Sequence, residues 1–88
     1  MRAPSVISNK YECLLFKRDA GLHCHHVYEG SRRTRSDEAG LWVWLCDMHH
    51  RAAHETELGR MLKERVQFAY ERTHTREEFM RITQKNYL

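Results

Sequence analysis

The chain passes from a predicted strand into a predicted helix at Leu45-Cys46-Asp47-Met48-His49-His50-Arg51-Ala52-Ala53-His54. The apolar residues 41–45 before it are rich in β-formers and predict a largely buried strand. Asp47 is the expected N-cap of the helix. His50 and His54 are four residues apart, which places both imidazoles on one helix face, close enough to bind one cation.

A second histidine pair, His25-His26, lies upstream in residues 22–28, which also read as a strand. The order strand, loop, strand, helix is a ββα unit, and 23 residues separate His26 from His50. Neighbouring residues of a strand point to opposite faces, so the two imidazoles of the pair cannot easily bind the same ion. One of them is expected to bind metal, and the other to stay free to take a proton.

The other segments complete an expected α+β domain. Residues 1–10 read as a loose arm, and 11–88 as one domain with a ββα core at about 22–56. The arginine-rich residues 31–36 predict an exposed loop, and helices are expected from 57 to 72 and again from a capping box at 75–78, ending near 84. The inward positions expected on these helices are Leu58, Met61, Leu62, Val66, Ala69, Phe79 and Ile82. Residues 86–88 are expected to return to the core.

The composition is typical of a small globular domain but does not identify its function. The chain has 88 residues, enough for one domain with a marginal core that a metal would help to stabilise. Its net charge of +3 leans towards a polyanionic partner. Three cysteines cannot form a closed set of disulfides, and no apolar run is long enough for a signal peptide or membrane span. A reducing cytoplasm is therefore expected, where cysteine beside histidine suggests metal.

These motifs together resemble the HNH (ββα-metal) endonuclease superfamily, with active-site spacing similar to colicin DNase domains. Most of the chain, from about residue 13 onward, resembles small phage-encoded HNH-like proteins. The matching motifs are His25-His26-Val27, the basic residues 32–36, the segment 40–46, Arg76-Glu77-Glu78-Phe79 and Asn86-Tyr87-Leu88. The resemblance implies a small ββα-metal core with a two-stranded antiparallel hairpin, a metal-binding helix and C-terminal helices. It also implies a phage or prophage protein in the bacterial cytoplasm.

Carried over residue by residue, the resemblance makes His26 the general base and His25, His50 and His54 the metal ligands. Histidine titrates near neutrality and can deprotonate a water, while the metal neutralises charge on the phosphate and on the leaving 3′ oxygen. The implied activity is DNA hydrolysis to 5′-phosphate and 3′-hydroxyl ends. Arginines beside such a site are expected to contact DNA phosphates. They are Arg32, Arg33 and Arg35.

Two departures from the family pattern weaken this reading. Many HNH enzymes orient the base with an asparagine, but residues 41–45 contain none, so either a backbone carbonyl does so or the base is poorly held. The family's Cys-x-x-Cys zinc knuckle is also incomplete, because Phe16 stands three positions after Cys13, where a second cysteine is expected. Cys13, Cys46 and His49 remain as candidate structural zinc ligands, while a closed site needs four. Cys24 would be the fourth only if its strand turned it inward.

Several alternatives stay open. The chain could be a zinc-stabilised nucleic-acid-binding module without cleavage, or an accessory that acts with a phage recombination or packaging protein. The active metal is not fixed: three imidazoles accept zinc or nickel, whereas magnesium or manganese would be held weakly and completed by water and phosphate. His23 and His74 have no partner pattern and read as ordinary polar residues. Trp42 and Trp44 read as core and sheet cover.

Overall fold

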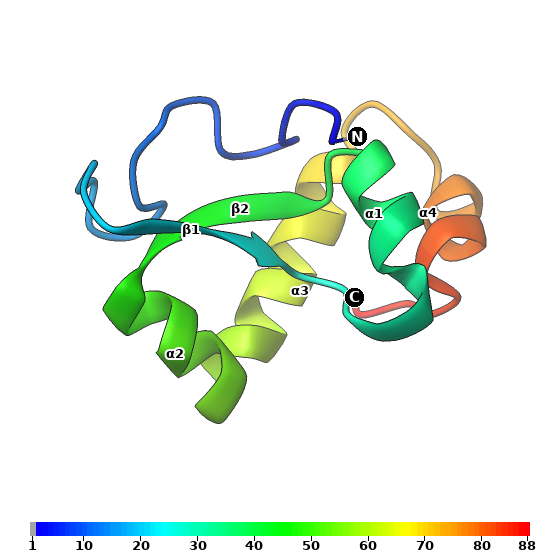
Figure 1. The fold of residues 1–88 in the computed structure, drawn as a ribbon. Helices are drawn as coiled ribbons and strands as arrows, with labels where there is room; N and C mark the ends of the chain where they lie inside the picture. Colours follow the sequence, from blue (N-terminus) through cyan, green and yellow to red (C-terminus); the bar gives the residue numbers. More distant parts are fainter. Residues whose placement is uncertain (1) are drawn as a thin grey trace.

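A two-stranded antiparallel hairpin and several helices form a small α+β fold (Figure 1). The structure is a computed structural model and describes residues 2–88, apart from the side chain of Arg32. Its elements in chain order are β1 (Leu22–His26), the 3-10 turn η1 (Gly30–Arg32), α1 (Arg33–Glu38), β2 (Trp42–Cys46), α2 (Asp47–Glu55), α3 (Leu58–Tyr70) and α4 (Arg76–Thr83). Within the described range, no helix is long and apolar enough to cross a membrane.

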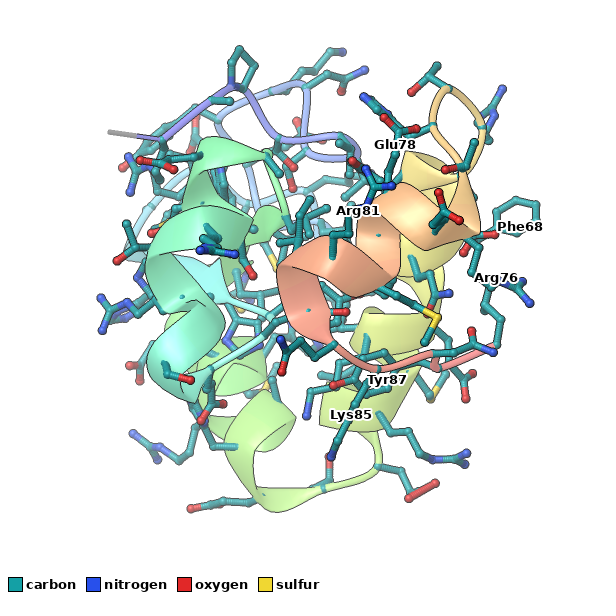
Figure 2. All side chains as sticks on the ribbon, turned by 90° about the vertical axis from the view of Figure 1, so that its right-hand side faces the viewer. Phe68, Arg76, Glu78, Arg81, Lys85 and Tyr87 are labelled. Carbon is teal, nitrogen blue, oxygen red and sulfur yellow. The ribbon has the colours of Figure 1, made fainter. Side chains whose placement is uncertain are left out.

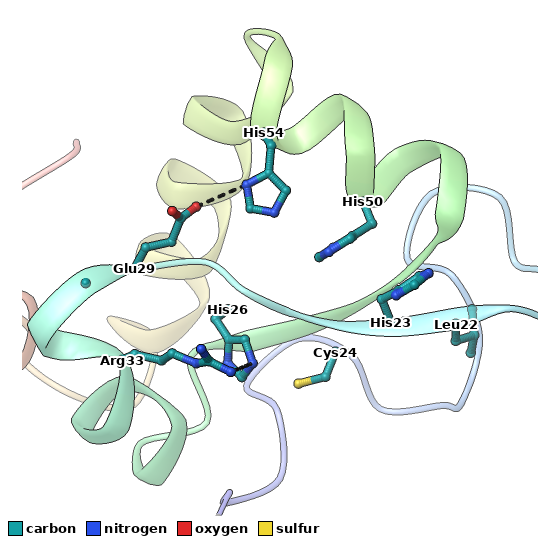
Figure 3. A pocket seen from close by; sticks show the side chains of 9 residues that line it. Leu22, His23, Cys24, His26, Glu29, Arg33, His50 and His54 are labelled. Atoms are coloured by element: carbon teal, nitrogen blue, oxygen red, sulfur yellow. Dashed lines mark hydrogen bonds and ion pairs between the residues drawn. The ribbon is translucent and has the colours of Figure 1, made fainter.

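The hairpin separates the two histidines of the upstream pair. Strands β1 and β2 pair in antiparallel register, with His25 opposite Val43 and His26 opposite Trp42. Because side chains alternate along a strand, His25 faces α2, where it is 2% exposed, while His26 lies on the other face. Cys24 shares the His26 face and points away from α2 (Figure 3). The expected strand over 22–28 is therefore found in shorter form.

Two local expectations are wrong. Asp47 is not the N-cap of α2: Cys46 holds that position with an extended backbone, and Asp47 is the first helical residue. A carboxylate there still favours the helix dipole, and it pairs with Arg51 at 3.3 Å. The arginine-rich segment is not a loop but forms η1 and α1. This short helix buries only Ser36, so it has no apolar periodicity from which a helix could have been predicted.

The core lies between β2, α3 and α4, and its fully buried residues include Leu41, Val43, Leu45, Leu62, Val66 and Phe79. Thr75 and Glu78 form the predicted capping box of α4. The expectation for Met61 is wrong, because it is 55% exposed, and Gln67 is buried instead. Gln67 uses its amide to hold the C-terminal segment: its Nε2 donates to Asn86 Oδ1 at 2.8 Å, and its Oε1 accepts from the Tyr87 N–H at 2.7 Å.

Helices α2 and α3 approach each other closely at Gly59. A Cβ built on Gly59 would lie 2.3 Å from the carbonyl oxygen of Ala53, a distance that no side chain tolerates. A glycine that weakens the start of α3 in isolation is therefore what lets α3 pack against α2. This contact fixes the helix that carries His50 and His54.

The N-terminal arm runs along the hairpin and reaches α1 (Figure 1). The Ala3 N–H donates to the Asp37 carbonyl at 3.0 Å, and Trp42 Nε1 donates to the Ala3 carbonyl at 2.7 Å. Gly40 has φ +78°, and a Cβ on it would lie 2.3 Å from the Pro4 carbonyl oxygen. The arm that was expected to be loose is thus hydrogen-bonded to α1 and to β2.

Replacing Tyr28 by phenylalanine is expected to lower stability most at neutral pH and less at alkaline pH. The Tyr28 hydroxyl donates to the Lys63 carbonyl at 2.5 Å, and burial, with Tyr87 nearby, raises its pKa well above the usual value. A raised pKa gives stability that is complete below about pH 10 and declines above it by up to ~1.4 kcal/mol per pH unit. Urea unfolding of both chains between pH 8 and 11.5 should show the gap closing. A constant gap would mean that the buried hydroxyl ionises normally.

Candidate metal centre

Three imidazoles from two elements converge between β1 and α2. They are His25 on β1 and His50 and His54 on consecutive turns of α2, and their candidate ligand atoms all lie within 4.8 Å of one another. The ring centroids are 5.3 Å apart for His25 and His50, and 4.9 Å apart for His50 and His54. The structure thus brings together the three residues expected as metal ligands, because strand alternation turns His25 towards the helix face that carries the other two.

Burial favours the neutral forms of His25 and His50 in this cluster. Burial, followed by the neighbouring His50 and His54, lowers the pKa of His25 to about 4. Burial and then His23 lower the pKa of His50. The Nδ1 atoms of His25 and His50 are also buried with no hydrogen-bond partner among the described residues. A divalent cation needs neutral nitrogen ligands, so the donor set fits such an ion.

A carboxylate holds the most exposed of the three rings. Glu29 Oε1 lies 3.3 Å from His54 Nδ1 (Figure 3). Metal-binding histidines commonly donate their second ring N–H to a carboxylate, which fixes both the tautomer and the ring orientation. Glu29 directly follows the segment predicted as a strand, but its position relative to His54 in the sequence did not predict a contact with α2.

His23 is not the isolated polar residue that was expected. Its ring stacks on His50 with centroids 4.7 Å apart and planes 5° from parallel. Its Nε2 lies 3.3 Å from Asp47 Oδ1 at the start of α2. The position of His23, two residues before His25 on the same strand face, was the signal that could have placed it here.

His26, on the opposite face of β1, is held by two side chains. Its Nδ1 lies 2.9 Å from Asp37 Oδ1, and Arg33 Nη2 lies 2.9 Å from its Nε2. A guanidinium can only donate, so Nε2 accepts and Nδ1 carries the proton that it donates to Asp37. This tautomer has its lone pair on Nε2. The expectation that only a backbone carbonyl could orient this ring is wrong, because the carboxylate of Asp37 does so.

A cavity of about 630 Å³ joins the two faces along the free edge of β1. It runs from the α2 histidines to the pair His26–Arg33 (Figure 3). Its lining residues are Leu22, His23, Cys24, His26, Glu29, Gly30, Arg33, His50 and His54. A single extended ligand in this cavity could therefore touch both the candidate metal ligands on α2 and the pair His26–Arg33.

The three arginines predicted to contact DNA have different positions. Arg33 reaches His26 in the cavity, while Arg35 is exposed on α1. The side chain of Arg32 lies outside the described part of the structure. Of the two arginines whose side chains are described, Arg33 is the one at the candidate site.

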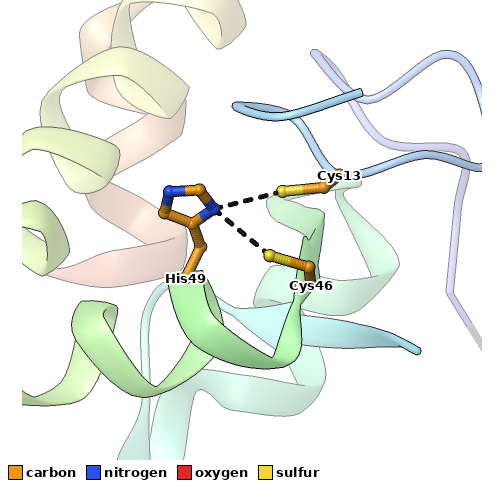
Figure 4. A group of neighbouring side chains, drawn as sticks. All are labelled: Cys13, Cys46 and His49. Carbon is orange, nitrogen blue, oxygen red and sulfur yellow. Dashed lines mark hydrogen bonds between the residues drawn. The ribbon is translucent and has the colours of Figure 1, made fainter. Parts of the chain in front are cut away.

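A second cluster joins a thiol near the N-terminus to the start of α2. His49 Nδ1 lies 3.5 Å from Cys13 Sγ and 3.3 Å from Cys46 Sγ (Figure 4). Both cysteines are buried, and the ring of Phe16 packs edge-on against His49 with centroids 4.2 Å apart. Burial opposes ionisation of Cys13, but hydrogen bonds from backbone N–H groups and from His49 lower its pKa to about 7. A thiolate that forms near neutral pH suits a metal.

Cys24 does not complete this second cluster. Among the described residues, the group around His49 with ligand atoms within 4.8 Å of one another consists of Cys13, Cys46 and His49 and does not include Cys24. Cys24 lies on the outer face of β1, where burial raises its pKa. The strand does not turn it inward, so the cluster has three protein donors in the described chain.

The chain was compared with protein-family models, with curated proteins and with solved structures, and no match was found in any of the three.

Proposed function

We propose that the chain is a metal-dependent endonuclease of the HNH (ββα-metal) kind, acting on DNA. One observation carries the proposal: three imidazoles converge beside a cavity, and a fourth, His26, lines the same cavity in the tautomer whose Nε2 is the acceptor, where it accepts from Arg33. A purely structural cluster would not need the fourth ring. The hairpin β1–β2 followed by α2 has the element order that such a core requires.

The residues divide the chemistry between them. His25, His50 and His54 would hold a divalent ion, which would neutralise charge on the phosphate and on the leaving 3′ oxygen. His26 Nε2 takes a proton from the water that attacks phosphorus, and the Asp37 carboxylate keeps the ring in the required tautomer. The bond from phosphorus to the 3′ oxygen breaks and that oxygen takes a proton from solvent, leaving 5′-phosphate and 3′-hydroxyl ends.

Arg33 occupies His26 Nε2, and a bound phosphate could remove it from that atom. Its guanidinium donates to His26 Nε2, the atom that must accept the proton. Guanidinium binds phosphate more strongly than a neutral imidazole nitrogen, because the charge-assisted pair can be bidentate. A phosphate entering the cavity would therefore draw Arg33 away and leave Nε2 facing the water.

Plasmid nicking with magnesium, manganese, nickel or zinc, each with and without chelator, tests the function. The expected result is nicking that needs one of these ions and stops when the ion is chelated. Three imidazole ligands favour nickel or zinc over magnesium for binding. Absence of turnover with all four ions would reject cleavage.

Replacing Asp37 by alanine is expected to slow nicking about 10- to 100-fold without changing metal content, because the base loses the partner that orients it. The Asp37→Asn variant should retain more activity, since its amide oxygen still accepts from Nδ1–H. Glu38→Ala is the matched control, an exposed acid on the same helix. Initial nicking rates and bound metal per chain give the answer, and parental rates in Asp37→Ala would remove Asp37 from the mechanism.

A non-cleaving nucleic-acid-binding module is the second candidate. The contact between Arg33 and His26 favours it, because that contact covers the lone pair that cleavage needs. This candidate predicts that the metal-bound protein binds DNA without cleaving it, and that the Arg33→Ala variant does not cleave DNA either. The endonuclease predicts that the parent cleaves.

We further propose that Cys13, Cys46 and His49 hold a structural zinc ion. Two thiols and an imidazole nitrogen are the ligand types that zinc prefers, and both thiols are buried. The site ties residues 11–17 to the first turn of α2, where His50 follows His49. A zinc ion here would therefore also position the α2 histidines.

A further inference from the structure

One face of α3 carries exposed residues that the candidate metal centre does not use. Met61, Arg65 and Phe68 are spaced i, i+4 and i+7 on α3, and Arg72 follows in the turn just after the helix; these four residues are here named the α3 stripe. Phe68 is 63% exposed and projects away from the body of the molecule (Figure 2). Together with Met61, which is 55% exposed, the Phe68 ring gives the stripe apolar surface that a ligand can cover.

The arginines of the α3 stripe differ from those elsewhere on the helices. The other exposed arginines of α2, α3 and α4 each pair with a carboxylate; they are Arg51, Arg60, Arg76 and Arg81. Among the described residues, the guanidiniums of Arg65 and Arg72 have neither an ion pair nor a hydrogen bond. Two unpaired positive charges, one on α3 and one in the turn that follows it, thus line the same hollow as the exposed ring.

The α3 stripe borders a hollow against the N-terminal arm. A cavity of about 430 Å³ is lined by Val6, Ile7, Asn9, Arg65, Phe68, Ala69 and Arg72. A second hollow of about 320 Å³ adjoins it and shares Val6, Ala69 and Arg72. Apolar side chains thus line part of the hollow, and the two guanidiniums stand at its wall. None of these residues lines the histidine cavity.

We propose that the α3 stripe is a second nucleic-acid surface, which binds a single strand. A base stacks on Phe68, and the flanking phosphates pair with Arg65 and Arg72. Stacking on an exposed ring needs a base that is free of its own stack, which favours a single strand over a duplex. The unpaired charges favour a polyanion over a protein, since the stripe itself carries no acidic residue. This surface goes beyond cleavage and requires none.

Fluorescence anisotropy with a labelled oligo(dT) strand of about twenty nucleotides tests the proposal. The protein is used in a His26→Ala background without added metal or chelator, and a gel afterwards checks that the strand is intact. Phe68→Ala should weaken binding at least about fivefold, and Phe68→Trp should restore it. Arg65→Gln combined with Arg72→Gln should lower the salt slope of the affinity by roughly 1.4. Arg81→Gln removes the same charge from a paired arginine and should change the affinity little.

Binding by Phe68→Ala that equals the background protein, with an unchanged salt slope in the double arginine variant, would overturn the proposal. So would concentration-dependent self-association that Phe68→Ala abolishes while the affinity for oligo(dT) stays the same, because the stripe would then join two copies of the chain. A cleaved strand in the gel would count against His26 as the base. The binding measurements would then be repeated with phosphorothioate oligo(dT), which resists cleavage, and the same outcomes would decide.

Discussion

The His26→Ala variant is expected to nick plasmid DNA at least about a hundredfold more slowly than the parent chain. A positioned general base accelerates a reaction roughly 10²- to 10⁴-fold. The Asp37 carboxylate accepts the proton on His26 Nδ1, and this leaves the lone pair of the ring on Nε2. Metal content should not change, because His26 lies on the face of β1 opposite to the cluster of His25, His50 and His54. Initial nicking rates and metal analysis of the same preparations measure both effects.

His74→Ala is the matched control, since His74 is exposed after the end of α3, beside Tyr70, and does not line the cavity. It should cleave as the parent does. His50→Ala should instead lose bound metal and activity together. If His26→Ala cleaved at the parental rate, the proton would be taken by another group. If it lost metal as well, His26 would be a ligand and not the base.

Of the variants considered, Cys46→Ser is expected to lower the free energy of unfolding most. Structural zinc supplies apparent folding free energies of ~10–16 kcal/mol in four-ligand sites, and a three-ligand site should supply at least about 3 kcal/mol of this. For a domain of this size that corresponds to a fall in Tm of at least ~12 °C. The cluster joins Cys13, near the N-terminus, to the start of α2, so its loss frees residues 11–17 from the helix.

Thermal melts under reducing conditions, with zinc measured per chain, check this prediction. Cys24→Ser is the control, because Cys24 lies on the outer face of β1 and outside the cluster. It should melt close to the parent and keep its zinc. A Cys46→Ser chain with parental Tm and unchanged zinc content would show that the three donors are only a packed group of side chains.

Simple periodicities predicted the framework of the candidate site. The period of 3.6 places His50 and His54 on one face of α2, and the period of two sends His25 and His26 to opposite faces of β1. The capping box at Thr75 and the return of the C-terminal segment also follow from local pattern. Each of these features depends on residues within one or two elements.

The contacts that complete the site could not be predicted, because each joins side chains of separate segments. Asp37 reaches His26 from α1, a helix without an apolar face, and Glu29 reaches His54 across to α2. The spacing of two residues places His23 on the strand face of His25, but its stacking on His50 also depends on how α2 packs against β1. The orienting group that the family takes from an asparagine would here be Asp37, which lies on α1 and not on the second strand.

The arm and α1 connect the N-terminal residues to His26, the proposed base. The Ala3 N–H bonds to the carbonyl of Asp37, whose carboxylate holds His26. Gly40 permits this close approach next to Pro4. The ring that would take the proton is thus positioned by three segments: the arm, α1 and β1.

Anomalous diffraction from crystals of the parent chain grown with nickel would test the central claim most directly. The account predicts a peak bound by nitrogen atoms of His25, His50 and His54, with the ring of His26 outside the coordination sphere and still paired with Asp37. A peak elsewhere, or one that includes His26 among its ligands, would contradict the division of labour on which the proposed nuclease depends.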